Sequence, residues 1–197
     1  MTHIVKEFMQ QGIWLSRMTD QAAWGLTDLI QGMGLDVKGI EIGVNRGLNS
    51  AMLLDACPNI TKLVGIDPYK AYVDWLGPVD QSLLDRDYSI FLENYEIMKN
   101  RFELIKLPSE QAAIQLDDNA YDFVFIDGDH STRAVVSDLE KYAPKVKIGG
   151  LISGHDVGIK TVNIGLQAWF RNYKIDLNQI HVVENHAWYW KKDRTLK

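Results

Sequence analysis

The chain has 197 residues and a formal net charge of −5, with 46% hydrophobic and 24% charged residues. This balance is typical of a soluble globular protein, and the length suits a single domain over 1–197. Lys and Arg do not cluster, which disfavours a nucleic-acid partner, and no run of about 18–20 apolar residues predicts a membrane span. The one cysteine, Cys57, excludes a disulfide framework. Because the N-terminus lacks the apolar core of a signal peptide, the expected location is the cytoplasm.

The first part of the chain, about 1–35, is expected to form a helical segment, and its Trp14 and Trp24 would offer a surface on which two chains could pair. Beyond it, continuous apolar runs alternate with segments of helical spacing. The runs that predict strands are 37–43, 62–67, 102–107, 121–127 and 149–154. The segments that predict helices are 48–57, 82–102, 108–116, 132–144 and 161–174. The tail, 180–192, predicts two short strands around Glu184 and Asn185.

This alternation predicts an α/β fold, namely a Rossmann-like, doubly wound and mainly parallel sheet with a C-terminal antiparallel edge hairpin. Ligands of such open sheets bind outside the carboxyl ends of the strands. Polar residues that directly follow the predicted strands are therefore the candidates for a functional site.

A glycine turn, EIGVNRGLNS (41–50), joins the first predicted strand to its helix. Glycines let the backbone approach a ligand closely, and the N-terminus of a helix is electropositive. Asp67 ends the second strand about 20 residues after Gly47, where an acid accepts hydrogen bonds from ribose hydroxyls. The order Glu41-x-Gly43-x-x-x-Gly47 differs from the G-x-G-x-x-G of dinucleotide-binding proteins, so NAD is not expected.

The glycine turn resembles motif I of the class I methyltransferases, E/D-x-G-x-x-x-G, whose cofactor is S-adenosylmethionine. The resemblance implies that Glu41 serves the methionine ammonium group, which needs a nearby anion. It also implies that Ser109 and Glu110, in KLPSEQAA (106–113), border the adenine, although Leu107 stands where the family has glycine. The implied cofactor-binding residues are Glu41, Gly43, Asn45, Gly47, Ser50, Asp67, Pro68, Ser109, Glu110 and Asp127. Without a ligand, Ser109 would be a helix N-cap, and the two roles are compatible.

Two strand ends carry clusters of Asp and His, in FIDGDH (125–130) and GHD (154–156). They bring to one rim Asp127, Asp129, His130, His155 and Asp156. Gathering such polar groups costs free energy unless something binds them. A divalent cation would neutralise Asp127 and Asp156, with His155 as a nitrogen ligand. Without a cation, Asp127 and Asp129 would cap the helix that begins near Thr132 or brace the loop.

The two clusters together resemble the metal-dependent O-methyltransferases, which include catechol O-methyltransferase and the macrocin and aminocoumarin sugar O-methyltransferases. The resemblance implies that Asp127, His155 and Asp156 hold Mg, Mn or another divalent cation, with His155 in the place of an acid. The implied base is Asp129, as in the sugar-modifying branch, or His130, which replaces the lysine of the catechol branch. The implied reaction is O-methylation of a small hydroxylated molecule, whether sugar, polyol or catechol.

Three other functions fit parts of the sequence. A metal-independent methyltransferase would use His130 as its base and keep Asp127, His155 and Asp156 as a hydrogen-bonded brace. A metal-dependent hydrolase would use the same rim without needing Glu41, and a non-catalytic cofactor-binding module would need no second cluster. The aromatic segment 68–88 either folds over a substrate or packs against the helix that follows it.

Overall fold

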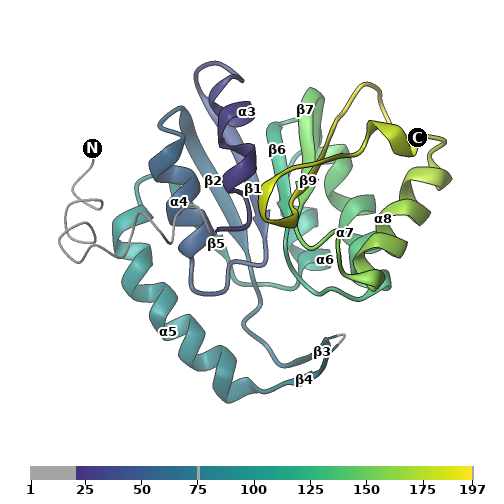
Figure 1. Cartoon of the computed structure of the whole chain (residues 1–197). Helices are drawn as coiled ribbons and strands as arrows, with labels where there is room; N and C mark the ends of the chain where they lie inside the picture. The colour runs from purple at the N-terminus through teal and green to yellow at the C-terminus, as the bar shows by residue number, and fades with distance from the viewer. Residues whose placement is uncertain (1–20, 75, 197) are drawn as a thin grey trace.

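The computed structural model describes residues 21–74 and 76–196 and is built around a seven-stranded sheet in the order β5-β2-β1-β6-β7-β9-β8 (Figure 1). Its strands are β1 (Val37–Ile42), β2 (Ile60–Ile66), β5 (Phe102–Ile105), β6 (Tyr121–Ile126), β7 (Val146–Gly154), β8 (His181–Val182) and β9 (Trp188–Lys191). The first five in spatial order run parallel, and β9 and β8 form an antiparallel edge. This confirms the predicted doubly wound sheet with its C-terminal edge hairpin.

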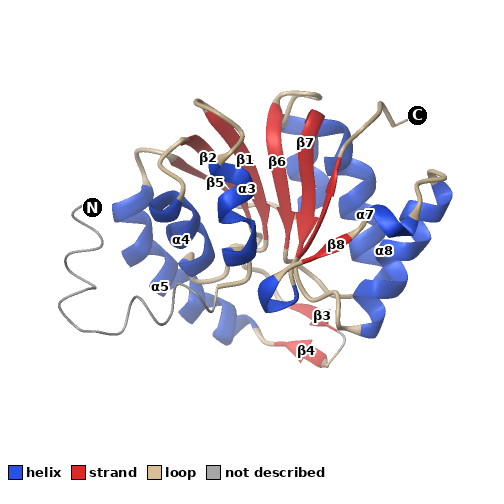
Figure 2. Cartoon of the chain, turned by 45° about the horizontal axis from the view of Figure 1, so that its top comes forward, coloured by secondary structure: helices blue, strands red, loops and turns tan. Residues whose placement is uncertain are grey.

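Helices cover both faces of the sheet (Figures 1 and 2). They are α3 (Thr27–Gln31), α4 (Leu48–Ala56), α5 (Gln81–Met98), α6 (Ser109–Ala112), α7 (Thr132–Tyr142) and α8 (Lys160–Asn172). Side chains alternate along each strand, so the buried residues form two clusters, one on each face. Along β6, Phe123 and Phe125 belong to the cluster of α4 and α5, whereas Val124 and Ile126 belong to that of α7 and α8.

A small antiparallel hairpin, β3 (Tyr72–Asp74) with β4 (Gly77–Val79), lies at the carboxyl ends of the parallel strands (Figure 2). It occupies the aromatic segment for which the sequence left two interpretations open. Val73 and Leu76 are 70% and 79% exposed, so this part of the hairpin does not pack into the core. Asp74, by contrast, is 14% exposed in its side chain and turns toward the site described below.

The N-terminal segment is described only from residue 21, so Trp14 and most of the predicted helical region lie outside the described residues. Trp24 begins a short 3₁₀ helix, η1 (Trp24–Leu26), and packs partly buried against the α4 and α5 side of the core. Among the helices within 21–74 and 76–196, none is both long and apolar enough to cross a membrane.

Candidate functional site

A cavity of about 730 Å³ opens where the parallel strands end, as expected for this fold. The predicted site residues that line it are Gly43, Asn45, Asp67, Pro68, Ser109, Asp127, Asp129, His130, His155 and Asp156. Four others, Glu41, Gly47, Ser50 and Glu110, lie outside its wall. The cavity therefore brings the glycine turn and both Asp and His clusters into one continuous space.

The two glycines of the turn each have a local structural reason. Gly43 has a φ of +86°, and a Cβ built on it would overlap the carbonyl oxygen of Asp127, so only glycine lets the ends of β1 and β6 approach this closely. Gly47 has a φ of +76° and occupies the N-cap position of α4. Both positions therefore require the left-handed backbone region that glycine enters without strain.

Asp67 holds two loops of the cavity wall together. Its Oδ2 accepts hydrogen bonds from the backbone N–H groups of Val44 and Asn45 at 3.1 and 3.0 Å, and its Oδ1 accepts one from Tyr69 at 2.8 Å. The hydroxyl of Tyr69 donates in turn to the carbonyl of Asn45 at 2.6 Å. Asn45 and Tyr69 both have positive φ, of 50° and 46°. These contacts stabilise a backbone conformation that side-chain-bearing residues rarely adopt, a kind of strain often found at ligand sites.

Glu41 is completely buried beneath the glycine turn. It accepts hydrogen bonds from Ser50 Oγ and, at 2.8 Å, from Asn49 Nδ2. Burial raises the pKa of Glu41 to about 7, because desolvation of the carboxylate outweighs the two hydrogen bonds. Asn49 lines the cavity while Glu41 does not, so any contact of Glu41 with a methionine ammonium group would have to be indirect.

In a Glu41→Gln variant, the free energy of unfolding should fall less as pH rises than it does in the wild type. The folded pKa of about 7 exceeds the usual 4.5, so ionisation of Glu41 destabilises the fold progressively as pH rises between these two values. A pKa difference of two to three units corresponds to about 3 kcal/mol in the free energy of unfolding. Glutamine does not ionise, so the variant should not lose this stability. Urea unfolding of both proteins at about pH 5 and pH 8 would measure this difference. Parallel pH dependences in the two proteins would contradict it.

Ser109 does not cap α6, contrary to one of its two predicted roles. The N-cap position belongs to Pro108, and Ser109 Oγ instead donates to Asp138 Oδ1 at 2.6 Å. The hydroxyl of Tyr142 donates to the carbonyl of Ser109 at 2.7 Å, so α7 holds this loop from two positions. Asp138 lines the cavity and is 4% exposed, and it was not among the residues predicted from the sequence. Its place on the apolar stripe with Val135 and Leu139 was the available signal.

Glu110 does not line the main cavity. It is exposed, accepts a hydrogen bond from Ser137 Oγ at 3.0 Å, and lines a second, smaller cavity of about 330 Å³. The resemblance that assigned it to the adenine is therefore not matched by a position on the cavity wall.

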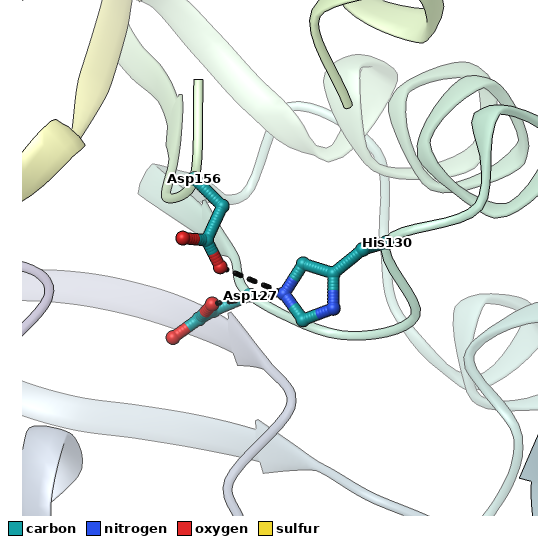
Figure 3. Close-up of side chains that lie close together, drawn as sticks. All are labelled: Asp127, His130 and Asp156. Carbon is teal, nitrogen blue, oxygen red and sulfur yellow. Dashed lines mark ion pairs between the residues drawn. The ribbon is translucent and has the colours of Figure 1, made fainter. Parts of the chain in front are cut away.

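The side chains of Asp127, His130 and Asp156 point toward one another at the ends of β6 and β7 (Figure 3). His130 Nε2 lies 2.8 Å from Asp156 Oδ2 and 4.0 Å from Asp127 Oδ1. His155 approaches the same two oxygens, with its Nδ1 at 3.2 Å from Asp156 Oδ2 and 3.5 Å from Asp127 Oδ1. Asp156 has a φ of 57°, so this cluster also includes a strained backbone position.

Each imidazole is oriented by a contact of its other ring nitrogen. His155 Nε2 lies 2.6 Å from the carbonyl of Asn185, to which it donates a hydrogen bond. His130 Nδ1 lies 3.3 Å from both carboxylate oxygens of Asp74, which reaches in from β3. Asp74 is therefore a site residue that sequence reasoning missed. Asp74 and His130 are 56 positions apart in the sequence, and no local sequence pattern predicted their contact.

The carboxylates keep both imidazoles protonated at neutral pH. The contact with Asp156, which outweighs burial, and the contact with Asp74 raise the pKa of His130 to about 9. Burial lowers the pKa of His155, but Asp127 and Asp156 more than offset this and raise it to about 10. The pKa of Asp156 falls well below its usual range beside His130 and His155. His130 is therefore already protonated at neutral pH, and it would have to lose this proton before it could act as a general base.

The cluster fits a divalent cation by its donor set. Asp127, His130 and Asp156 each offer one ligand atom, that of His130 once Nε2 has released its proton, and these atoms all lie within 4.8 Å of one another. His130 Nε2 is buried and makes no hydrogen bond of ordinary geometry, even though Asp156 lies close. The sequence predicted Asp127, His155 and Asp156 as ligands, and the structure places His130 beside the same two carboxylates. A set of two carboxylates and an imidazole suits Mg²⁺, Mn²⁺ or a softer ion such as zinc.

Asp129 follows the cluster without joining it. Its Oδ1 accepts a hydrogen bond from the backbone N–H of Ser131 at 2.8 Å, and Ser131, not Asp129, is the N-cap of α7. Ser131 Oγ accepts from Ala134 N at 3.2 Å, which completes that cap. Asp129 thus braces the loop, as one interpretation predicted, and it lines the cavity as well.

Comparison with known proteins identifies the fold and the family. A family model of a methyltransferase domain matches residues 40–157, and no curated protein matches the chain. The structure resembles the O-methyltransferase NovP with a TM-score of 0.62 and 13% identity, over 92% of this chain and 81% of that one. It also resembles an rRNA methylase from Streptococcus thermophilus, with a TM-score of 0.59 and 9% identity over 85% and 94% of the two chains. A candidate caffeoyl-CoA O-methyltransferase from Staphylococcus aureus gives 0.54 and 16%, over 84% and 80%.

At these identities the structural likeness concerns the fold alone. The family model covers more than half of the chain, and its match includes the glycine turn, Asp67 and both Asp and His clusters. The chain therefore belongs to the methyltransferase-domain family, and its methyl donor is S-adenosylmethionine.

Proposed function

We propose that the protein is an O-methyltransferase that acts on a small, uncharged hydroxylated molecule with the help of a divalent cation. The observation that carries this proposal is the convergence of His130 and His155 on the same two oxygens, Asp127 Oδ1 and Asp156 Oδ2, in the wall of the cofactor cavity. Such a cluster is what a hydroxyl substrate needs beside the methyl donor, namely a cation site and a proton acceptor at one place.

The residues that would hold the cation are Asp127, Asp156 and the imidazole of His130, with His155 beside them. A bound divalent cation would lower the pKa of a substrate hydroxyl and orient it. Among the carboxylates of the two Asp and His clusters, Asp129 is the one best placed to accept the hydroxyl proton, because Asp127 and Asp156 pair with the imidazoles and Asp129 does not. The glycine turn and Asp67 would position the cofactor so that the two reactants are held together, which can lower the barrier by roughly 7–11 kcal/mol.

The charge of the cavity supports an uncharged acceptor. Its wall carries six carboxylates, those of Asp67, Asp87, Asp127, Asp129, Asp138 and Asp156, against four basic side chains, Arg46, Lys70, His130 and His155. Arg46 is itself paired with Asp87 at 2.9 Å. A polyanionic substrate such as a nucleic acid or a coenzyme A ester would meet mostly like charge here. A sugar, a polyol or a catechol would not.

A second candidate is a metal-independent methyltransferase. Both imidazoles already face carboxylates, and their raised pKa values mean that the protonated pair could balance most of the cluster's charge without a cation. In that case Asp127, His155 and Asp156 would act as the brace that the sequence suggested.

Transfer of a radiolabelled methyl group from S-adenosylmethionine to a panel of catechols, sugars and polyols tests the proposed reaction. We expect at least one vicinal diol to be methylated on oxygen in the presence of Mg²⁺ or Mn²⁺, with the site of the label established by mass spectrometry. Matched amines and thiols serve as controls for the acceptor atom. Labelling of the amines or thiols with no labelled diol would contradict O-methylation.

A further inference from the structure

We propose that Asp74, from the hairpin of β3 and β4, is a positioning residue that acts through His130. Its carboxylate would hold the ring hydrogen of His130 on Nδ1 and so make Nε2 the nitrogen that this chain offers to a cation beside Asp127 and Asp156. This inference rests on the divalent cation of the proposed function, and it adds to that site a partner from a separate element of the fold.

The first step concerns the contacts between Asp74 and His130. Nδ1 of His130 lies 3.3 Å from both carboxylate oxygens of Asp74, and the backbone N–H of His130 donates to Asp74 Oδ1 at 3.3 Å. The side chains of Asp74 and His130 are 14% and 21% exposed, so water has little access to these contacts. Because an ionised carboxylate only accepts hydrogen bonds, Nδ1 must carry the hydrogen.

The second step follows from the tautomer that Asp74 selects. In a neutral imidazole one nitrogen carries the hydrogen and the other a lone pair, so a hydrogen on Nδ1 leaves the lone pair on Nε2. Nε2 of His130 lies 2.8 Å from Asp156 Oδ2 and 4.0 Å from Asp127 Oδ1, and the three side chains point toward one another (Figure 3). Histidines that bind metals usually donate their other ring N–H to a carboxylate or carbonyl, which fixes the ring and makes the ligand nitrogen more basic.

The third step compares the two imidazoles of the site by their outer partners. His155 Nε2 donates to the backbone carbonyl of Asn185 at 2.6 Å, which is a neutral acceptor. His130 Nδ1 instead faces the carboxylate of Asp74. An ionised acceptor makes the stronger hydrogen bond, so the ring of His130 is the one that gains more from its outer partner. That partner is a side chain and can be replaced.

The fourth step concerns the hairpin that carries Asp74. The side-chain amide of Gln81, at the start of α5, donates to the carbonyl of Tyr69 at 2.9 Å and accepts from the N–H of Ala71 at 3.0 Å. These two hydrogen bonds tie the chain before β3 to the chain after β4. Asp74 therefore reaches His130 from a backbone whose base is held by contacts within the protein.

Calorimetric titration of the full chain with Zn²⁺, in the presence of S-adenosylhomocysteine, tests the proposal. Zn²⁺ is the probe because imidazole nitrogen is one of its preferred ligands, and the binding that Asp127→Asn removes defines the site. In Asp74→Asn this binding should weaken roughly 10- to 100-fold, the usual cost of losing an outer partner of a metal-binding histidine. The asparagine amide can donate to Nδ1, which would place the ring hydrogen on Nε2 and block the ligand atom.

A matched control and a double variant separate positioning from a general loss of charge. Asp80→Asn makes the same substitution at the exposed residue that follows β4, whose side chain makes no cap hydrogen bond, and it should bind Zn²⁺ as the wild type does. In a protein that already carries His130→Gln, adding Asp74→Asn should change the affinity by no more than about twofold, because Asp74 acts through the replaced ring.

Two results of the titrations would overturn the proposal. Additive losses in the double variant would mean that Asp74 acts on the cation independently of His130. Unchanged binding in Asp74→Asn, with binding lost in Asp127→Asn, would remove the role of Asp74 and leave the cation site of the proposed function in place.

A measurement on the wild type covers the case in which Asp74→Asn does not fold. Nuclear magnetic resonance of the isotope-labelled ring nitrogens in Zn²⁺-saturated protein should show that His130 carries a hydrogen on Nδ1 and none on Nε2, with its signals assigned by their loss in His130→Gln. The opposite arrangement would overturn the proposal while leaving cation binding intact. A wild type that binds no Zn²⁺ at the site would overturn the cation role itself and this inference with it.

Discussion

An Asp129→Asn variant is expected to slow single-turnover methyl transfer roughly 10²–10⁴-fold, the usual contribution of a general base. Asparagine has the size of aspartate and can still accept the hydrogen bond from Ser131, so the loop that leads into α7 should keep its shape. What it cannot do is take up the hydroxyl proton. The measurement is the rate of label transfer from enzyme-bound S-adenosylmethionine to the diol identified in the acceptor panel.

If His130 and not Asp129 is the general base, a different pH dependence of the rate is expected. Because the pKa of His130 is raised to about 9, this side chain would have to lose its proton before acting, so the wild-type rate would climb as pH rises from neutrality toward that value. A His130→Gln variant shows which residue matters. If His130→Gln abolishes that climb and Asp129→Asn transfers methyl groups at close to the wild-type rate, Asp129 is not the base.

Chelator-treated wild-type protein is expected to bind one divalent cation, and Asp127→Asn should weaken that binding roughly 100-fold or more. Loss of an outer partner of a metal site already costs about 10- to 100-fold, and Asp127 would be a direct ligand. Calorimetric titration with Mn²⁺ in the presence of S-adenosylhomocysteine measures the affinity directly, without a substrate. Glu140→Gln, which makes the same change of charge outside the cavity, should bind the cation as the wild type does.

Activity gives an independent test of the same site. Removing the cation should lower methyl transfer by about a thousandfold if it supplies several kcal/mol of stabilisation to the transition state. Full activity of metal-free protein would exclude this role. The metal-independent candidate would then remain, with the protonated imidazoles of His130 and His155 beside Asp127 and Asp156.

Most of the sheet could be predicted from sequence because its strands are continuous apolar runs between helical segments. β7 begins at Val146, three residues before the predicted start at Gly149. Gly149 has a φ of +88° and donates to the carbonyl of Lys192, so it is an irregularity inside the strand and not its beginning. The hairpin of β3 and β4 was missed because three-residue strands leave too little pattern to detect.

The site was predictable where its residues directly follow strands, because topology alone brings Asp127, His130 and Asp156 to one rim. Contacts that depend on side-chain direction were not. Whether His130 or His155 lies nearer the carboxylates depends on rotamers, and the partner of His130, Asp74, comes from an unpredicted hairpin. Asp138 could have been predicted from the sequence, because an acid on the apolar stripe of an amphipathic helix must have a buried partner.

The three backbone hydrogen bonds to Asp67 bear on how the cofactor binds. They hold the loops after β1 and β2 in shape within the protein alone, with Asn45 and Tyr69 already in their unusual conformations. The conformational entropy of these loops is therefore lost during folding and not during association. Preorganisation of this kind lets more of the contact free energy appear as affinity. It also means that Asp67, the acid that the sequence predicted to bind the ribose, contributes to the rigidity of the cavity.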